Sequence, residues 1–307
     1  MNLINPNLRS VIRPTTFIKS DKLNEHLGLD ITIAAETFQR TGSFKFRAAY
    51  NLAASVENKA ILTASSGNFG QGLAFACRLL GKKCTVVMPL SSAKVKIDAV
   101  RNFGAEVDLI DTKIINRNQR VSELAADMPE AYIASAYDDD YVIAGNSTLG
   151  EELAKENFDV IIAPVGGGGL ISGIIQGLAR CNTQTRVFAA EPLLANDGAR
   201  SFRAGKLIPN EKEPLTIADG ARTISLGNRN WQFISGGVED FIEVEEAEIK
   251  DALRKLFELS NLKAEPTGSL SLAAAAKNRE MFAGKKICIV VSGGNVDPEI
   301  YRSLISG

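Results

Sequence analysis

The chain has 307 residues, of which 45% are hydrophobic and 23% charged, and its formal net charge at pH 7 is −1. This length allows one large or two medium domains with a substantial core. A nearly neutral balance gives no electrostatic attraction to nucleic acid or to an anionic membrane surface, so we expect neither as a partner.

Short β-branched segments alternate with helical patterns from residue 60 onward. Strands are predicted at 60–64, 84–88, 106–110 and 132–134, with helices at 69–80, 93–103 and 117–126 between them. Alternation of this kind, with short Gly or Pro breaks, is typical of a parallel sheet covered by helices on both faces.

The pattern restarts after residue 140. The sequence predicts a helix at 148–156, a strand at 160–163, a glycine loop, a helix ending at 179 and a strand at 186–190. Residues 192–235 are rich in loops with short helical pieces, and helices at 245–259 and 269–277 precede a buried strand at 287–291. Since neither a repeat nor a Pro-rich linker separates the parts, we predict two α/β lobes that share one cleft.

Cysteine and histidine narrow the chemistry. Cys77, Cys84, Cys181 and Cys288 show no Cys-x-x-Cys spacing, so we expect four buried thiols and no zinc site or disulfide framework. The single histidine, His26, lies in a polar, helix-like stretch and is expected at the surface, which argues against a Ser-His-Asp hydrolase. The first residues do not form a signal peptide and no apolar run reaches membrane-spanning length, so we expect a cytoplasmic protein.

Lys45 lies in the run Thr41-Gly42-Ser43-Phe44-Lys45-Phe46-Arg47, between two aromatic residues. An apolar neighbourhood lowers the pKa of an amine by desolvation, which suits a lysine that forms an imine with an aldehyde. A lysine between aromatic residues is also a common surface arrangement, in which the stem packs and the amine stays in water. Taken alone, the run leaves both interpretations open.

Four consecutive glycines, Gly166, Gly167, Gly168 and Gly169, follow a predicted strand and open a helix near Leu170. Glycine lets the backbone approach a phosphate closely, and a helix start presents free N–H groups and a partial positive charge. The alternative is a tight turn with positive φ, for which one or two glycines suffice. Glu191 lies where the acid of a dinucleotide site would be, but a strict Gly-x-Gly-x-x-Gly pattern is missing.

Two further loops end predicted strands with Ser, Gly and Asn. In the first, Ser65 to Gly72, backbone N–H groups are suited to a carboxylate, Asn68 to a phenolic oxygen and the Ser66 hydroxyl to proton transfer. In the second, Ser292 follows a buried strand, where open α/β sheets bind ligands. The alternatives are a second Gly-lined turn and a helix-capping serine.

One lysine, a glycine cradle and two Ser/Gly/Asn loops together are the parts needed to hold an aldehyde cofactor that carries a phosphate. We therefore interpret the chain as an enzyme that binds pyridoxal 5'-phosphate on Lys45.

The order of these motifs resembles the fold type II pyridoxal-phosphate enzymes, most closely the serine/threonine dehydratase and serine racemase branch. The resemblance extends over nearly the whole chain, through Arg13-Pro14-Thr15-Thr16, Thr216-Ile217-Ala218-Asp219-Gly220, Glu265-Pro266-Thr267-Gly268 and Ser292-Gly293-Gly294-Asn295. It implies the α/β fold of the tryptophan synthase β type, with two three-layer α/β/α domains and mostly parallel sheets. The large domain would comprise residues 1–55 and 140–307, the small domain residues 56–139, with the active site between them.

The resemblance also implies roles for individual residues. Lys45 would be the Schiff-base lysine, Asn68 would contact the phenolic oxygen of the ring and Ser292 would face the ring nitrogen. The phosphate would be held by Gly166, Gly167, Gly168, Gly169 and Leu170. The substrate would be bound by Ser65, Ser66, Gly67, Asn68 and Phe69, with Ser66 as a second catalytic proton carrier.

Glu191-Pro192-Leu193-Leu194-Ala195-Asn196-Asp197 resembles the divalent-cation site of the same branch. Its ligands would be Glu191, the carbonyl of Ala195 and Asp197, and oxygen ligands of this kind suit Mg²⁺ or Ca²⁺ in a structural role. The alternative is a pair of carboxylates that cap a helix.

Three departures from the branch leave the catalytic groups in place. Phe69 stands where the branch usually has His after Ser-Gly-Asn, so it affects the expected substrate specificity. Ala48-Ala49 replaces the usual Gly-Ala, and Gly145-Asn146-Ser147-Thr148 replaces Gly-Gln-Gly-Thr. The chain ends twelve residues after Asn295, so we expect no C-terminal regulatory domain.

The resemblance predicts dehydration and deamination of a β-hydroxy amino acid, L-serine or L-threonine, to a 2-oxo acid and ammonia. Racemisation of an amino acid is the nearest alternative, because it requires only a second proton carrier such as Ser66. A non-catalytic amino-acid sensor on the same fold is the alternative from another class. A homodimer is expected, since dimers are common in the family.

Overall fold

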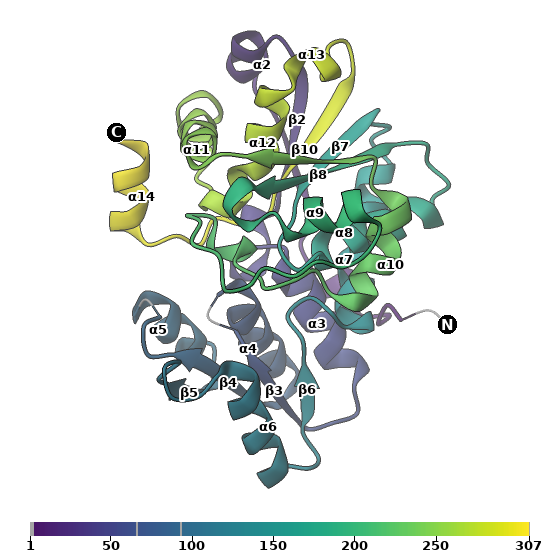
Figure 1. The fold of residues 1–307 in the computed structure, drawn as a ribbon. Helices are drawn as coiled ribbons and strands as arrows, with labels where there is room; N and C mark the ends of the chain where they lie inside the picture. The colour runs from purple at the N-terminus through teal and green to yellow at the C-terminus, as the bar shows by residue number, and fades with distance from the viewer. Residues whose placement is uncertain (1–2, 66, 93, 307) are drawn as a thin grey trace.

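The computed structural model describes residues 3–65, 67–92 and 94–306, which form two β-sheets (Figure 1). The six-stranded large sheet has the order β1 (Thr16–Lys19), β2 (Asp30–Ala35), β10 (Lys286–Val291), β7 (Val160–Pro164), β8 (Arg186–Pro192) and β9 (Asp240–Val244). The four-stranded small sheet has the order β5 (Glu106–Ile110), β4 (Lys83–Pro89), β3 (Ala60–Ala64) and β6 (Tyr132–Ala134). Every pairing of the described strands is parallel except that of β1 with β2, which confirms the predicted mostly parallel α/β fold.

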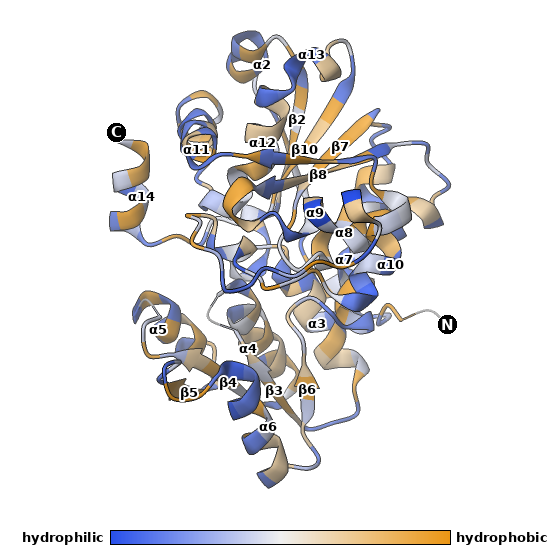
Figure 2. Cartoon of the chain, in the orientation of Figure 1, coloured by the Kyte–Doolittle hydropathy of each residue, from blue (hydrophilic) through white to orange (hydrophobic). Residues whose placement is uncertain are grey.

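The central strands of the large sheet are buried on both faces, as expected for parallel strands between helical layers. In β10, Ile287, Ile289 and Val291 enter one hydrophobic core, whereas Cys288 and Val290 enter the core on the opposite face. The first core contains helices α2 (Asp21–Leu27), α11 (Glu246–Ser260) and α12 (Pro266–Lys277), and the second contains α7 (Asp140–Ala154) and α8 (Gly169–Arg180). The strands of this sheet are mostly hydrophobic, while the helices outside them carry polar residues (Figure 2).

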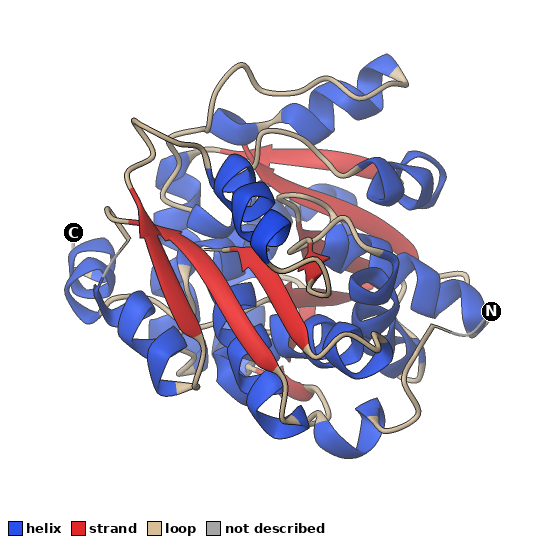
Figure 3. Ribbon diagram, turned by 90° about the horizontal axis from the view of Figure 1, so that it is seen from below, coloured by secondary structure: helices blue, strands red, loops and turns tan. Residues whose placement is uncertain are grey.

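The small sheet follows the same rule. Ile61 and Val86 pack toward helices α3 (Lys45–Ser55), α4 (Asn68–Leu80) and α5 (Lys94–Asn102). Leu62 and Val87, one position further along each strand, pack toward α6 (Arg117–Asp127) on the other face. Figure 3 shows strands enclosed by helices in this three-layer arrangement.

Helix α7 begins at Asp140, eight residues earlier than predicted. The carboxylate of Asp139 accepts hydrogen bonds from the amides of Tyr141 (2.8 Å) and Val142 (3.3 Å), so it caps the helix there. Gly145 lies inside the helix, where α3 is so close that an added Cβ would lie 2.6 Å from the carbonyl oxygen of Arg47.

Strands β1, β2 and β9 and helix α3 were not predicted. The remaining helices are α1 (Leu8–Val11), α9 (Asp197–Ala204), α10 (Asn228–Gly237), α13 (Arg279–Phe282) and α14 (Pro298–Ile305). His26 is exposed, as predicted. The prediction of four buried thiols is wrong for Cys181, which lies exposed just after α8, whereas Cys77, Cys84 and Cys288 are buried. Over the described ranges we find no helix that combines the length and apolar character required to traverse a bilayer.

Candidate active site

Lys45 is the first residue of α3, directly after a loop that the end of β10 holds in place. The amide of Phe44 donates to the carbonyl oxygen of Ser292 at 3.0 Å, and Ser43 forms an isolated antiparallel bridge with Gly293. These contacts bring Lys45 to the carboxyl end of a central parallel strand, where open α/β sheets bind ligands.

The amine of Lys45 lies in a partly apolar site. Its Nζ donates to the carbonyl oxygen of Ala136 at 2.7 Å and lies 5.0 Å from the ring centroid of Phe44 and 5.8 Å from that of Phe69. Burial lowers the pKa of Lys45 to about 8, although the nearby Glu265 acts in the opposite direction. A substantial fraction of the amine is therefore neutral near pH 8, and a neutral amine is nucleophilic and can accept a proton.

The four glycines connect β7 to α8, and their surroundings leave no room for side chains. A Cβ added to Gly166 would lie 2.6 Å from the carbonyl oxygen of Gly220. A Cβ added to Gly167 would lie 2.3 Å from the ring of Tyr137. Gly168 has φ +92°, a left-handed conformation that other residues rarely adopt. Neighbouring atoms therefore require glycine at positions 166 and 167, and the conformation of the turn favours glycine at position 168.

Three carbonyl groups of the glycine loop accept hydrogen bonds, whereas its amides find no partner within the described part of the chain. Asn230 Nδ2 donates to the carbonyl of Gly167 (2.8 Å), and Asn146 Nδ2 donates to that of Gly169 (2.9 Å). Among the described residues, the amides of Gly166 to Gly169 have no acceptor. A row of free N–H groups at the start of a twelve-residue helix is suited to an anion, so the loop fits a phosphate group.

The Ser65–Phe69 loop leads from β3 into α4. Ser65 Oγ accepts from the amides of Gly67 (3.4 Å) and Gly70 (3.1 Å), so its hydroxyl holds the start of the helix. Ser66, the predicted proton carrier, lies outside the described residues. Phe69 is buried, and its ring faces the Lys45 amine.

Asn68 lies between two polar side chains from the C-terminal part of the chain. Its Nδ2 donates to Glu265 Oε1 at 2.7 Å, and its Oδ1 accepts from Asn295 Nδ2 at 2.8 Å. Ser292 is buried directly after β10, and the following residue, Gly293, lies against Glu265 and Asn68. The structure thus brings Lys45, Asn68 and Ser292 together from three distant segments.

Glu265 is a buried carboxyl group at this site. Burial and the nearby Asp219 raise the pKa of Glu265 to about 8, while Lys96, Asn68 and Lys45 oppose the shift. Lys96 from α5 forms an ion pair with Asp219, which joins the helices of the small sheet to the loop beside the glycines. Burial therefore favours the uncharged form of the Glu265 carboxyl group.

The predicted cation ligands lie between the end of β8 and the start of α9. Both oxygens of Glu191 accept backbone amides at the start of α9, from Gly198 (3.1 Å) and Ala199 (2.9 Å). Burial and Asp197 raise the pKa of Glu191, and burial raises the pKa of Asp197 to about 6. Over the ranges that the structure describes there is no cluster of three or more His, Cys, Asp or Glu side chains suited to a metal, so the carbonyl of Ala195 would have to complete the set.

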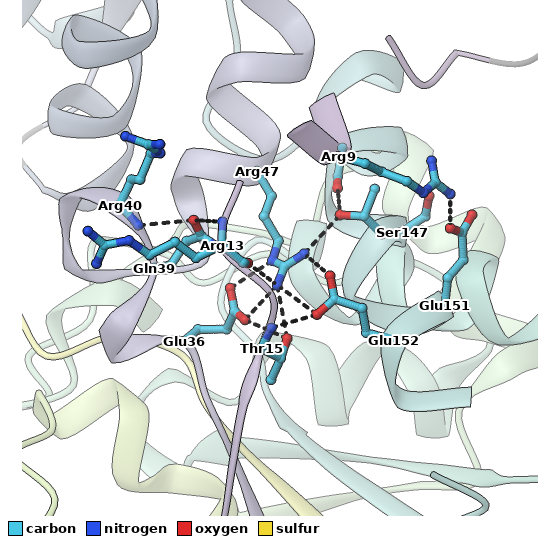
Figure 4. A network of polar contacts seen from close by, with 12 residues as sticks. Arg9, Arg13, Thr15, Glu36, Gln39, Arg40, Arg47, Ser147, Glu151 and Glu152 are labelled. Atoms are coloured by element: carbon cyan, nitrogen blue, oxygen red, sulfur yellow. Dashed lines mark hydrogen bonds and ion pairs between the residues drawn. The ribbon is translucent and has the colours of Figure 1, made fainter. Parts of the chain in front are cut away.

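A buried ion network fixes the first turn of α3, two residues after Lys45 (Figure 4). The guanidinium of Arg47 donates to Glu36 Oε1 (2.9 Å) and Oε2 (2.8 Å) and to Glu152 Oε1 (2.8 Å). It also donates to the hydroxyls of Thr15 (2.9 Å) and Thr148 (3.2 Å). The network joins the end of β2 to α7 and so fixes the helix that carries the lysine.

Sequence reasoning missed several residues of the site. Tyr137 packs over Gly167, and its carbonyl accepts from Asn230 Nδ2 at 3.0 Å, although no motif contains it. Glu265 and Asn295 lie within motifs that carried the resemblance, but no role was predicted for either residue. The available signal for Glu265 was an acidic residue directly before Pro266, at the start of helix α12.

This arrangement defines a cofactor-dependent enzyme of the α/β class, and comparison with known proteins specifies the family. The family model "Pyridoxal-phosphate dependent enzyme" matches residues 8–293, and the chain belongs to that family, whose cofactor is pyridoxal phosphate.

Three similar proteins illustrate the relationship. The L-threo-3-hydroxyaspartate ammonia-lyase of Saccharomyces cerevisiae is 36% identical over 306 residues, covering 98% of this chain and 93% of that protein. The L-threonine ammonia-lyase of Thermotoga maritima is 32% identical over 305 residues, covering 97% of this chain and 75% of that protein. The structure of maize serine racemase has a TM-score of 0.91 at 31% identity, covering 98% of this chain and 94% of that one. The resemblance to the dehydratase and racemase branch is confirmed.

Proposed function

We propose that the protein is an ammonia-lyase that converts a β-hydroxy amino acid to a 2-oxo acid and ammonia. The observation that carries this proposal is the amine of Lys45, with a pKa lowered to about 8, at the carboxyl end of β10 beside a glycine loop with free amides. Elimination requires a base that is partly neutral near physiological pH, and this amine meets that requirement.

Pyridoxal phosphate supplies, when bound, a carbonyl that condenses with amines and a ring that withdraws electrons. Lys45 would hold the carbonyl carbon of the cofactor. The amides of Gly166 to Gly169 and of Leu170 would bind its phosphate, and Asn68 would bind its phenolic oxygen. Ser292 would face the ring nitrogen with a neutral hydroxyl, which favours elimination over transamination. We infer that residues 56–139 form the small domain and 1–55 with 140–307 the large one, with the site between them.

After the amino group of the substrate has replaced Lys45 at the carbonyl carbon, the freed Lys45 amine takes the proton from the α-carbon of the substrate. The β-hydroxyl gains one proton and leaves as water, which balances the proton removed from the α-carbon. Hydrolysis then replaces the amino group, so the net reaction converts a β-hydroxy amino acid to a 2-oxo acid plus ammonia. The substrate carboxylate would be bound by the loop of Ser65, Ser66, Gly67 and Asn68, and Phe69 would border the substrate. Phe69 is buried with its ring facing the Lys45 amine, so it reduces access of water to that amine.

L-Serine and L-threonine are the substrates that the sequence favours. The names of the relatives add L-threo-3-hydroxyaspartate, which carries a second carboxylate. The test is a panel of these three amino acids, assayed for 2-oxo acid, for ammonia and for the opposite enantiomer. Formation of 2-oxo acid from one of them supports the proposal.

Racemisation is the second candidate, supported by the similarity to the serine racemase of maize. If the D-enantiomer forms faster than the 2-oxo acid, the protein is a racemase and the proposal of a lyase is wrong. A visible absorption band without turnover of any amino acid would indicate a sensor.

We also propose a structural Mg²⁺ or Ca²⁺ held by Glu191, the carbonyl of Ala195 and Asp197. Two buried carboxyl groups with raised pKa values fit a bound cation, because a cation compensates their negative charges. The apparent melting temperature should rise with added Ca²⁺ or Mg²⁺ and fall with a chelator, and the Asp197→Asn variant should lose this response.

A further inference from the structure

The side-chain amide of Asn68 is held at both ends by residues more than 190 positions away. Glu265 Oε1 accepts from its Nδ2 at 2.7 Å across a separation of 197 residues. Asn295 Nδ2 donates to its Oδ1 at 2.8 Å across a separation of 227 residues. Asn68 is the first residue of α4, so its side chain is fixed relative to a rigid helix.

Two glycines make room for these contacts. An added Cβ at Gly293 would lie 2.6 Å from Glu265 Oε1 and 3.3 Å from Asn68 Nδ2, so the hydrogen bond between them passes directly over this glycine. An added Cβ at Gly42 would lie 2.4 Å from Asn295 Oδ1. Glycine at position 42, shortly before Lys45, therefore leaves room for the side chain of Asn295. Glycine at position 293, directly after Ser292, leaves room for that of Glu265.

The contacts permit one orientation of the Asn68 amide. Asn295 directs its Nδ2 at both Asn68 and the carbonyl oxygen of Thr41 (2.7 Å), so it presents a donor to Asn68. If the Asn68 amide were reversed, its NH₂ group would face this donor, and two donors cannot form a hydrogen bond with each other. The second N–H of Asn68 Nδ2 therefore points in a fixed direction that neither Glu265 nor Asn295 uses.

We propose that Glu265 is a positioning residue, which acts through Asn68 to hold one amide N–H ready for the phenolic oxygen of bound pyridoxal phosphate. Asn295 assists from the opposite side. This inference rests on the proposed contact between Asn68 and the cofactor.

The requirement at position 265 is for an acceptor and not for a charge. A carboxyl oxygen accepts from Asn68 Nδ2 whether or not the group carries a proton, and a glutamine oxygen does the same. Glu265→Gln is therefore the matched control, whereas Glu265→Met keeps the length of the side chain and removes the acceptor.

The experiment is a double-mutant cycle on the full-length apoprotein, read out by cofactor affinity. Wild type, Glu265→Met, Glu265→Gln, Asn68→Ala and the Asn68→Ala/Glu265→Met double variant are titrated with pyridoxal phosphate, and the visible absorption band is followed. Thermal unfolding of each apoprotein is recorded in parallel. We expect Glu265→Met to weaken cofactor binding about tenfold, as for the loss of one hydrogen bond, and to shift the band, while Glu265→Gln stays within about twofold.

The double variant decides the result. If Glu265 acts through Asn68, the double variant binds the cofactor no more weakly than Asn68→Ala alone. Additive losses, or a Glu265→Met variant that melts earlier but keeps the affinity and the band of the wild type, overturn the inference. An Asn68→Ala variant with unchanged affinity and band instead refutes the proposed role of Asn68, which separates the two failures.

Discussion

The carbonyl oxygen of Ala136 accepts a hydrogen bond from Lys45 Nζ at 2.7 Å. The next residue, Tyr137, packs its ring against Gly167, so a single short segment contacts both the lysine and the glycine loop. The segment follows β6 of the small sheet and precedes α7 of the large one. A displacement of this segment would therefore affect both the lysine and the glycine loop.

Replacement of Lys45 by Ala should abolish the covalent attachment of pyridoxal phosphate. We expect turnover to fall by at least ~10³-fold, because the variant lacks the nucleophile and the base at once. Borohydride reduction followed by peptide mass mapping checks this in the wild type, where the label should lie on Lys45. Lys22→Ala, at an exposed position, is the control; a label on any other lysine contradicts the assignment.

Replacement of Gly167 by Ala should weaken binding of the cofactor. The added methyl group would lie 2.3 Å from the Tyr137 ring, so the ring or the loop must shift and the row of amides is disturbed. We expect the dissociation constant of pyridoxal phosphate to rise by about tenfold or more, for a loss near ~1.4 kcal/mol. Gly236→Ala is the matched control, because nothing lies within 4 Å of its added Cβ. Equal affinities for the two variants would rule out a cradle at this loop.

Glu265 should make the apoprotein less stable as the pH rises from 4.5 to 8. Its pKa rises from 4.5 in the unfolded chain to about 8 in the folded protein, so the folded protein binds more protons across this interval. Its contribution to stability is present below pH 4.5 and is lost as the pH rises through 8. Subtracting the free energy of unfolding of Glu265→Gln from that of the wild type should give a fall on the order of 2–4 kcal/mol between these pH values.

Lys45 acts in the opposite direction at higher pH. Its pKa falls from 10.5 in the unfolded chain to about 8 in the folded protein, so stability should rise between pH 8 and 10.5. Lys45→Met should remove this rise in denaturant unfolding of the apoprotein. A wild-type curve that is flat across both intervals would contradict the assigned pKa shifts.

Replacement of Arg47 by Met should lower the free energy of unfolding by about 3–5 kcal/mol, because the buried carboxylate of Glu36 loses its partner. Adding Glu36→Gln should recover part of the loss, since the double variant no longer buries an unpaired charge. Urea unfolding at neutral pH measures the free energy of unfolding of the single and the double variant. Arg302→Met, which breaks an exposed pair with Glu299, should change stability by less than ~1 kcal/mol; a comparable effect of both variants would contradict the role of burial.

Motifs that chemistry constrains locally could be predicted from the sequence. The four glycines and the strand before them were predicted together, because the loop needs both backbone freedom and a helix start. Glu36 and Glu152 could not be assigned to Arg47, since those partners lie 11 and 105 residues away and only the fold brings them together. The start of α7 was predicted eight residues too late. Asp139 caps the helix, and Gly145 lies inside it because the contact with α3 leaves no room for a side chain.

Among the predicted site residues, Lys45, Asn68 and Ser292 come from distant segments that meet near the carboxyl end of β10, and the segment Ala136–Tyr137 lies between Lys45 and the glycine loop. The second layer of contacts was not foreseen, because the roles of Glu265 and Asn295 depend on orientation and burial. Tyr137 left no signal, since an aromatic residue after a short strand is common in any core.

Strand β10 lies between β2 and β7 at the centre of the large sheet, and Asn295 bonds the backbone of Thr41 across 254 residues of chain. A ribosome-bound nascent chain therefore cannot assemble this sheet, or take up the vitamin-derived coenzyme, until synthesis has passed β10. Such a high contact order slows folding and leaves the edges of β2 and β7 exposed to aggregation or chaperones in the meantime.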